Sequence, residues 1–223
     1  MNTPINLNIN LDPEILENLD KNKETYVNIY NNSFEKLAKI EIGNISKRTK
    51  SEVIDRTKLK LNFFENKVFL EIKNKKIYYL EESQKNGKKY LDIFSSVLIL
   101  HYLLNADGTP LANRWISFRE LPDGLFYWRT IPKILEPLVR KYESSGDKFL
   151  TKIMEIDGKI NKGFEHGSVV YPFKMFPVLM ILYEKDEEFE ASLRVLFDSS
   201  ASHYLKTDVI KLVVACIVKK LCA

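Results

Sequence analysis

The chain has 223 residues, of which 45% are hydrophobic and 29% are charged, a balance that supplies a packed core and excludes global disorder. Its formal net charge of +4 lies in residues 1–89, which hold 17 Lys and Arg against 13 Asp and Glu, whereas residues 90–223 hold 17 of each. The excess is mostly lysine and is interleaved with acids, without an arginine-rich stripe. We therefore expect a solvated surface and no nucleic-acid partner.

No segment has the features of a targeting or membrane sequence. The first residues lack the charged end and apolar run of a signal peptide. The apolar run over residues 91–104 is shorter than the about 20 residues that span a bilayer. Cys216 and Cys222 fall on different faces of one predicted helix and are poorly placed to form a disulfide. We therefore expect a cytoplasmic protein with free thiols and no membrane partner.

The N-terminal part predicts helices followed by strands. Asp12-Pro13 starts a short helix up to residue 20, within an N-terminal extension over residues 1–23. Residues 24–39 carry apolar side chains at helical spacing and predict a second helix. Residues 45–56 fit either a loop or one helical turn. The segments that then alternate apolar and polar residues predict an antiparallel meander, with strands over residues 59–63, 68–72 and 76–80.

We expect the rest of the chain to be organised around residues 90–131. Residues 91–104 are apolar on nearly every face, which predicts a buried central helix. This helix ends in the turn residues Asp107-Gly108, and a second turn follows at Asp123-Gly124. Both tryptophans of the chain lie in this stretch, and aromatic side chains carry large apolar areas into a core or a site.

The C-terminal part predicts helices around three strands. A helix covers residues 131–142, where Pro137 predicts a kink or a break. Further helices are expected over residues 148–156 and 209–221, and strands over residues 168–176, 178–183 and 191–197. This order predicts an α+β fold, with one domain over residues 24–223 and a mostly antiparallel sheet covered by helices.

The first candidate site is the polar segment over residues 198–204. It holds a carboxylate, three serine hydroxyls and an imidazole, which are the groups that acid–base and nucleophilic catalysis use. It lacks the G-x-S-x-G pattern of a nucleophile elbow, and Asp and Ser are also frequent in turns and helix caps. The segment is thus interpreted either as a structural turn or as a ligand-binding loop.

The second candidate site comprises the two turns that follow residue 104. Together with Arg119 and Glu120, these turns would form a polar mouth on an apolar body, the usual anatomy of a small-molecule pocket. We hypothesise that Asp198 and His203 approach residues 105–124, and that both segments make one pocket at one end of the sheet. Its apolar walls would come from Phe118, Phe126 and Tyr204. The candidate ligand-binding residues are Asp107, Arg119, Glu120, Asp198, Ser200, His203 and Tyr204.

Metal ligands are sparse in the sequence. The three histidines and two cysteines show no zinc-finger or iron–sulfur spacing. His101, within the predicted buried helix, is better explained as a satisfied core residue than as a ligand. The acidic run over residues 184–190 lacks the glycine that organises an EF-hand loop. We therefore expect no metal site, and the sequence does not identify a cofactor.

Two segments of the chain resemble a known family. They read LILHYLLNADGTPL with WISFRELP (residues 98–111 and 115–122), and LFDSSASHYL (residues 196–205). They are similar to family 3786 of domains of unknown function, found in anaerobic bacteria and archaea. Its marker is a Leu-Phe-Asp-Ala-like stretch after an acidic turn, which here reads KDEEF at residues 185–189, and Ser199 stands where alanine is usual. The resemblance covers about residues 25–210 and implies a shared fold.

The resemblance implies no particular reaction, because the family is uncharacterised. Some relatives look fused to a four-cysteine iron–sulfur domain like that of corrinoid proteins. This chain lacks those cysteines and cannot carry such a cluster itself. A link to one-carbon or corrinoid chemistry is therefore an analogy.

Three functions remain open at this point. The first is a cytoplasmic small-molecule-binding or accessory protein of anaerobic metabolism, with its pocket at the two candidate segments. The second is an enzyme, a hydrolase or transferase, that uses Asp198 and His203. The third is a structural partner in an enzyme complex. A deep cleft would favour the first two functions, and a flat exposed apolar patch would favour the third.

Overall fold

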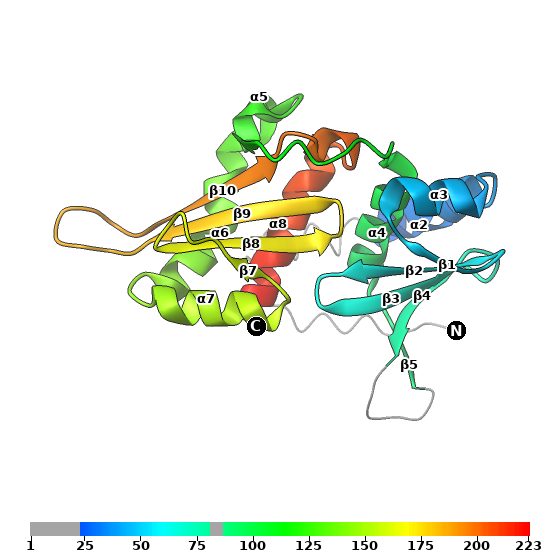
Figure 1. Ribbon diagram of the computed structural model, residues 1–223, viewed down its shortest axis with the longest axis horizontal. Coiled ribbons are helices and arrows are strands. Elements are labelled where there is room, and N and C mark those ends of the chain that lie inside the picture. The colour runs from blue at the N-terminus through cyan, green and yellow to red at the C-terminus, as the bar shows by residue number, and fades with distance from the viewer. Residues whose placement is uncertain (1–22, 81–86) are drawn as a thin grey trace. The chain divides into compact units, whose positions relative to one another are not determined.

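The structure is a computed structural model that describes residues 23–80 and 87–223, and its residues group into two compact units, Met1–Gly108 and Thr109–Ala223 (Figure 1). Each unit contains one five-stranded antiparallel sheet. The single sheet expected from the sequence is therefore replaced by two. The single domain expected over residues 24–223 stays a prediction. The helix expected at residues 12–20 lies outside the described residues.

Unit 1 begins with two helices, α2 (Lys23–Leu37) and α3 (Ile42–Thr49). The predicted helix over residues 24–39 is confirmed in α2, whose apolar side buries Phe34 and Leu37. Helix α3 lies largely in the stretch left open as a loop or one turn. It buries Ile45, and the residue that follows its last turn, Lys50, adopts a left-handed conformation with φ of 57°.

The sheet of unit 1 is a meander in the order β1-β2-β3-β4-β5. The three predicted strands are confirmed, because their alternating apolar residues form the buried face of this sheet. Two short strands at the edges were not predicted. The strands are β1 (Glu52–Asp55), β2 (Lys58–Phe63), β3 (Asn66–Glu71), β4 (Lys76–Leu80) and β5 (Lys88–Tyr90).

A buried carboxylate ties four strands of this sheet together. Glu71, only 8% exposed, accepts hydrogen bonds from Asn74 Nδ2 at 2.9 Å, Tyr78 Oη at 2.8 Å and Lys88 Nζ at 3.1 Å. Lys58 Nζ on β2 lies 3.2 Å from the same carboxylate. The bonds from Asn74 and Tyr78 outweigh the effect of burial and, with the two lysines, lower the pKa of Glu71 to about 2.

Helix α4 (Ile93–Asn105) confirms the apolar helix expected over residues 91–104. Asp92 caps it by accepting a hydrogen bond from Ser95 N at 2.9 Å. Nine of its 13 residues are buried, but so are ten of the 16 residues of α8 (Thr207–Cys222) in unit 2. The structure thus has two buried helices in separate units, and it does not single out α4 as the centre of the molecule.

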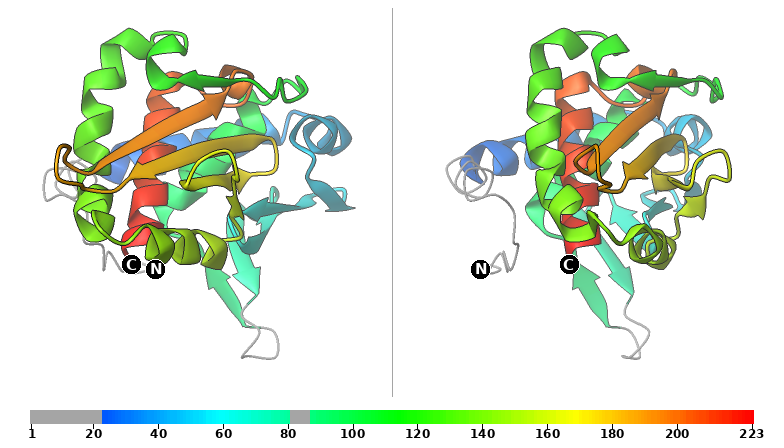
Figure 2. Two further views of the ribbon diagram at one scale, coloured as in Figure 1. Left: turned by 60° about the vertical axis from the view of Figure 1, so that its left-hand side comes forward. Right: turned by 90° about the vertical axis from the view of Figure 1, so that its left-hand side faces the viewer.

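Unit 2 has the strand order β6-β10-β9-β8-β7, and helices α6 and α8 lie along one face of its sheet (Figures 1 and 2). Long-range pairing places β6 beside β10, with Trp115 opposite Asp198. The strands are β6 (Trp115–Ser117), β7 (Lys159–Ile160), β8 (His166–Phe173), β9 (Phe176–Tyr183) and β10 (Ser192–Asp198). The other helices are α5 (Gly124–Tyr127), α6 (Ile131–Tyr142) and α7 (Gly146–Glu155).

The helix expected over residues 131–142 is confirmed in α6, and of the kink or break expected at Pro137 the break does not occur. Helix α6 runs through Pro137 without a break. Tertiary packing explains this, because α6 buries Leu135 and Leu138 on both sides of the proline and Tyr142 in its last turn. None of the described helices combines the length and apolar character needed to cross a membrane.

The buried position of α4 gives a first prediction. Leu100 is 0% exposed, and we expect Leu100→Ala to lower the free energy of unfolding by about 2–5 kcal/mol, since it leaves a cavity in a packed core. Leu104→Ala on the same helix is the matched control, because Leu104 is only partly buried. Chemical denaturation measures both variants. An equal or smaller loss for Leu100→Ala would contradict the burial.

The Glu71 network gives a second prediction, on pH. Because the folded pKa of about 2 lies below the usual 4.5, the stabilisation by Glu71 is fully present above pH 4.5 and is lost as the pH falls toward 2. We expect Glu71→Gln to cost about 1–3 kcal/mol at neutral pH and the difference from the unsubstituted chain to shrink on acidification. Denaturation over a pH series measures this, with the exposed Glu24→Gln as the control. If the difference in unfolding free energy between Glu71→Gln and the unsubstituted chain grew at low pH, the predicted direction of the pKa shift of Glu71 would be wrong.

Candidate functional site

The first polar segment of the sequence forms a clasp in unit 2. Asp198, at the end of β10, is 2% exposed and accepts hydrogen bonds on both carboxylate oxygens. The donors are the backbone amides of Ala112 at 2.9 Å and Asn113 at 2.7 Å, and both the amide and the hydroxyl of Ser200 at 2.9 and 2.6 Å. One carboxylate thereby holds the loop that leads into β6.

His203 and Tyr204 bind the same loop. The buried Tyr204 donates its hydroxyl hydrogen to the carbonyl oxygen of Thr109, and His203 Nδ1 lies 3.2 Å from Thr109 Oγ1. The amide of Ser199 donates to the carbonyl of Arg114 at 2.8 Å. We call residues 198–204 with residues 109–114 the clasp. The expected approach of Asp198 and His203 to residues 105–124 is thus present at residues 109–113.

The electrostatics of the clasp suit a structural anion. Burial raises the pKa of Asp198, but the hydrogen bonds from Ser200, Ala112 and Asn113 together lower it below its usual value. At neutral pH the side chain is therefore an ionised acceptor that has no proton to donate. Four donors already occupy it, so Asp198 is poorly placed to orient His203 as a catalytic base.

Arg119 and Glu120 are engaged in their own neighbourhood. Glu120 Oε2 accepts hydrogen bonds from the amide and the hydroxyl of Ser117, both at 2.7 Å, and these bonds lower its pKa. The guanidinium group of Arg119 lies 5.0 Å from the ring centre of Trp128. Of the three expected pocket walls, Phe118 and Tyr204 are buried but Phe126 is 80% exposed. The expectation that Phe126 walls a pocket was therefore wrong.

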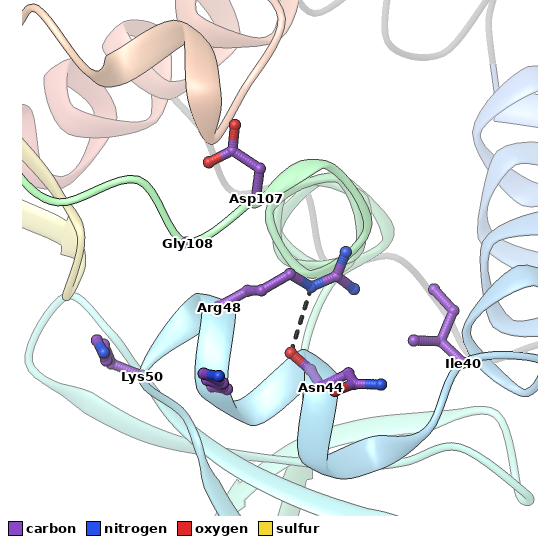
Figure 3. A pocket seen from close by; sticks show the side chains of 7 residues that line it. Ile40, Asn44, Arg48, Lys50, Asp107 and Gly108 are labelled. Carbon is purple, nitrogen blue, oxygen red and sulfur yellow. Dashed lines mark hydrogen bonds between the residues drawn. The ribbon is translucent and has the colours of Figure 1, made fainter.

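A cavity lies in unit 1, beside the C-terminal end of α3 (Figure 3). Its volume is about 490 Å³, and we call it the α3 pocket. Asp107 is the one predicted site residue that lines it. The full lining is Ile40, Asn44, Lys47, Arg48, Lys50, Asp107 and Gly108.

The lining of the α3 pocket is basic. It carries three cations, Lys47, Arg48 and Lys50, against the single carboxylate of Asp107, whose side chain points away from Arg48 in Figure 3. None of the three cations forms an ion pair with a carboxylate among the described residues. An anion entering the pocket would therefore meet a net positive charge.

Arg48 supplies the most specific feature of the pocket. Its Nε atom donates a hydrogen bond to the carbonyl oxygen of Asn44 at 3.2 Å, which fixes the guanidinium group against α3. Its Nη2 atom is buried and has no hydrogen-bond partner within the described part of the chain. A buried donor without an acceptor costs about 1–3 kcal/mol, and a bound oxyanion would remove that cost.

The backbone of Gly108 closes one side of the pocket. Gly108 has φ of +90°, a conformation that L side chains rarely adopt, and a Cβ atom there would lie 3.4 Å from both Cα and Cγ of Arg48. Glycine at position 108 thus allows the chain to change direction shortly after α4. It also allows the backbone of Gly108 to lie close to Arg48.

The sequence analysis missed Asn44, Lys47, Arg48 and Lys50. The signal was present, because residues 47–50 hold three cations in four positions, but the run was interpreted as part of a solvated surface. In residues 23–80 and 87–223, no three His, Cys, Asp or Glu side chains come together as metal ligands. Cys216 is buried, Cys222 is half-buried, and neither forms a disulfide.

Comparison with known proteins yields one finding. A family model described as a domain of unknown function, DUF3786, matches residues 41–220. The match includes α3, α4, both sheets and the clasp. No curated protein and no solved structure matches the chain.

The clasp gives a third prediction. We expect Asp198→Asn to lower the free energy of unfolding by about 2–4 kcal/mol, because an amide group turns a donor toward backbone N–H groups that need an acceptor. The matched control is Asp186→Asn, whose carboxylate also accepts two backbone amide hydrogen bonds but is exposed. Urea denaturation measures both. Equal losses would show that burial adds nothing to the role of Asp198.

Proposed function

The chain belongs to the DUF3786 family, and we propose that it is a binding or accessory protein that holds a small anionic molecule in the α3 pocket. The observation that carries this proposal is the buried Nη2 atom of Arg48, which has no acceptor in the described chain although it lies at a basic cavity. Guanidinium groups bind carboxylate and phosphate oxygens with two parallel hydrogen bonds when both nitrogens of one edge are available.

The dimensions of the pocket support a small ligand. A cavity of about 490 Å³ falls within the range of about 300–1,000 Å³ that holds small molecules in other proteins. Lys47 and Lys50 are exposed and contribute mainly long-range attraction, which salt screens. Arg48 offers directed hydrogen bonds, and Ile40 is the one aliphatic side chain of the lining. This combination suits a compact carboxylate or phosphate compound.

The clasp supports a binding role over a catalytic one. The enzyme alternative needs Asp198 and His203 to act on a substrate, but Asp198 already accepts four hydrogen bonds and His203 contacts Thr109. We accordingly place catalysis by these residues second. A cytoplasmic, accessory role in anaerobic metabolism, including one-carbon or corrinoid chemistry, rests on the family resemblance alone.

The fourth prediction tests the α3 pocket. We expect orthophosphate, pyrophosphate or citrate to bind the full chain in calorimetric titrations, with an affinity that falls as sodium chloride is added. Arg48→Gln should weaken binding at least about tenfold, the equivalent of about 1.4 kcal/mol, because it removes the directed donors. Arg56→Gln, an exposed arginine in the β1–β2 turn outside the pocket, is the control and should bind like the unsubstituted chain.

Two outcomes would count against this function. One is the absence of binding by all three anions together with the absence of any anionic small molecule from native mass spectra of the purified chain. The other is an equal loss of affinity in Arg48→Gln and Arg56→Gln, which would indicate attraction to the general positive charge instead of a built site.

A further inference from the structure

A short segment of unit 2 presents large apolar side chains to solvent. Residues 122–130, which we call the knuckle, contain α5 and the turn after it. Leu125 is 62% exposed, and Phe126, at 80%, is the most exposed large hydrophobic residue of the described chain. Neighbouring exposed apolar side chains of this size are typical of surfaces that bind another molecule.

The knuckle is held firmly from below. Leu121 is buried, and a Cβ atom on Gly124 would lie 2.1 Å from the carbonyl oxygen of Phe118, so the chain is packed closely at that point. The hydroxyl of Thr207 donates to the carbonyl oxygen of Pro122. The exposure of Leu125 and Phe126 therefore comes from a fixed backbone, and a fixed apolar anchor loses little entropy on binding.

Three cations lie against the aromatic rings of Tyr127 and Trp128, which follow Leu125 and Phe126 in the knuckle. Arg119 and Arg129 lie 5.0 and 5.8 Å from the ring centre of Trp128, and Lys211 lies 5.2 Å from that of Tyr127. In the described part of the chain, none of these three cations pairs with a carboxylate. Aromatic and arginine side chains are the residues that contribute most to binding at protein interfaces. The chemistry that fits the knuckle is an apolar side chain accompanied by acids.

The loop between β9 and β10 has that chemistry. Residues 184–190, which we call the acidic loop, hold five carboxylates and one lysine. Phe189 in this loop is 68% exposed and is second only to Phe126 among the large hydrophobic residues described. Asp186 accepts hydrogen bonds from the amides of Glu188 and Phe189 at 2.8 and 2.7 Å. These bonds hold the backbone of the turn in which Phe189 is exposed.

Two carboxylates of the acidic loop are available for a partner. Lys185 pairs with Glu190 at 2.9 Å, and Glu184 accepts a hydrogen bond from the amide of Gly146 at 2.7 Å. Glu187 and Glu188 are exposed and form no ion pair with the described residues. The knuckle and the acidic loop project from separate places on unit 2 (Figures 1 and 2), so one chain does not join its own two surfaces.

We propose that the knuckle of one chain binds the acidic loop of a second copy. Phe189 would pack on Leu125 and Phe126, while Glu187 and Glu188 would pair with Arg119, Arg129 or Lys211. The two most exposed large hydrophobic residues thus cover each other, and the opposite charges around them select the pairing. This inference is independent of the α3 pocket.

The expected association is weak and sensitive to salt. Stable interfaces bury about 1,200–2,000 Å² in total, and one knuckle with one loop is too small to reach that area. A reciprocal pair of contacts around a two-fold axis would double the buried area and close a dimer, whereas a single contact would link chains head to tail. Either arrangement increases the average mass with protein concentration and is weakened by added salt.

The fifth prediction uses sedimentation velocity of the full chain over a concentration series at low and high salt. We expect self-association at low salt, and we expect Phe126→Ser and Phe189→Ser each to weaken it at least about tenfold, the equivalent of about 1.4 kcal/mol. Met154→Ser is the control, because Met154 is 50% exposed on α7, outside both surfaces. Circular dichroism confirms that each variant remains folded.

A charge exchange makes the test specific. Arg129→Glu and Glu188→Arg should each weaken association, and the double variant should restore it, since the opposite charges then meet in exchanged positions. A chain that stays monomeric at every concentration would overturn the proposal, as would association that Phe126→Ser, Phe189→Ser and the charge variants leave unchanged. Phe126-dependent binding to vesicles of anionic lipid by a chain that stays monomeric would assign the knuckle to a membrane surface and also overturn it.

Discussion

A charge taken out of water costs several kcal/mol unless hydrogen bonds replace the water that it loses, and this constraint determines which polar residues of the chain are structural. Glu71 and Asp198 meet it fully. Each is a buried carboxylate surrounded by donors, and in each the pKa is lowered despite burial. The donors stabilise both carboxylates in their ionised form. Glu71 thereby links strands of the sheet of unit 1, and Asp198 links β10 to the loop before β6.

The distance along the chain between paired strands explains how much of the two sheets could be predicted from the sequence. Period-two alternation over residues 58–80 predicted the meander of unit 1 because its strands pair through tight local turns. The sheet of unit 2 was harder, since β6 pairs with a strand about 80 residues later in the chain, and no local pattern shows this. Strands as short as β5 and β7 give too few residues for any period to be recognised.

The candidate site shows a different limit. Composition made residues 198–204 attractive, because a carboxylate, hydroxyls and an imidazole are the groups of catalytic sites. Whether such groups act on a substrate or on their own chain depends on which donors reach them, and the donors to Asp198 include two amides at residues 112 and 113. Nearly every residue has a backbone amide, and the sequence does not show which of these amides donate to a given carboxylate. The proximity of the two segments was predictable, whereas the saturation of Asp198 was not.

Buried polar atoms that lack a hydrogen-bond partner differ in whether a ligand could reach their side chains. Two buried side-chain atoms of the described chain lack a hydrogen-bond partner, Ser168 Oγ and Arg48 Nη2. Ser168 is fully buried in β8, a strand enclosed on almost every side, so its hydroxyl costs stability and is out of reach of a ligand. Arg48 has the same deficiency but lines a cavity, beside Lys47 and Lys50, where an acceptor can enter from solvent. An unpaired donor points to a binding site only where its side chain lines an open space with matching charge, and of these two side chains Arg48 lines such a space.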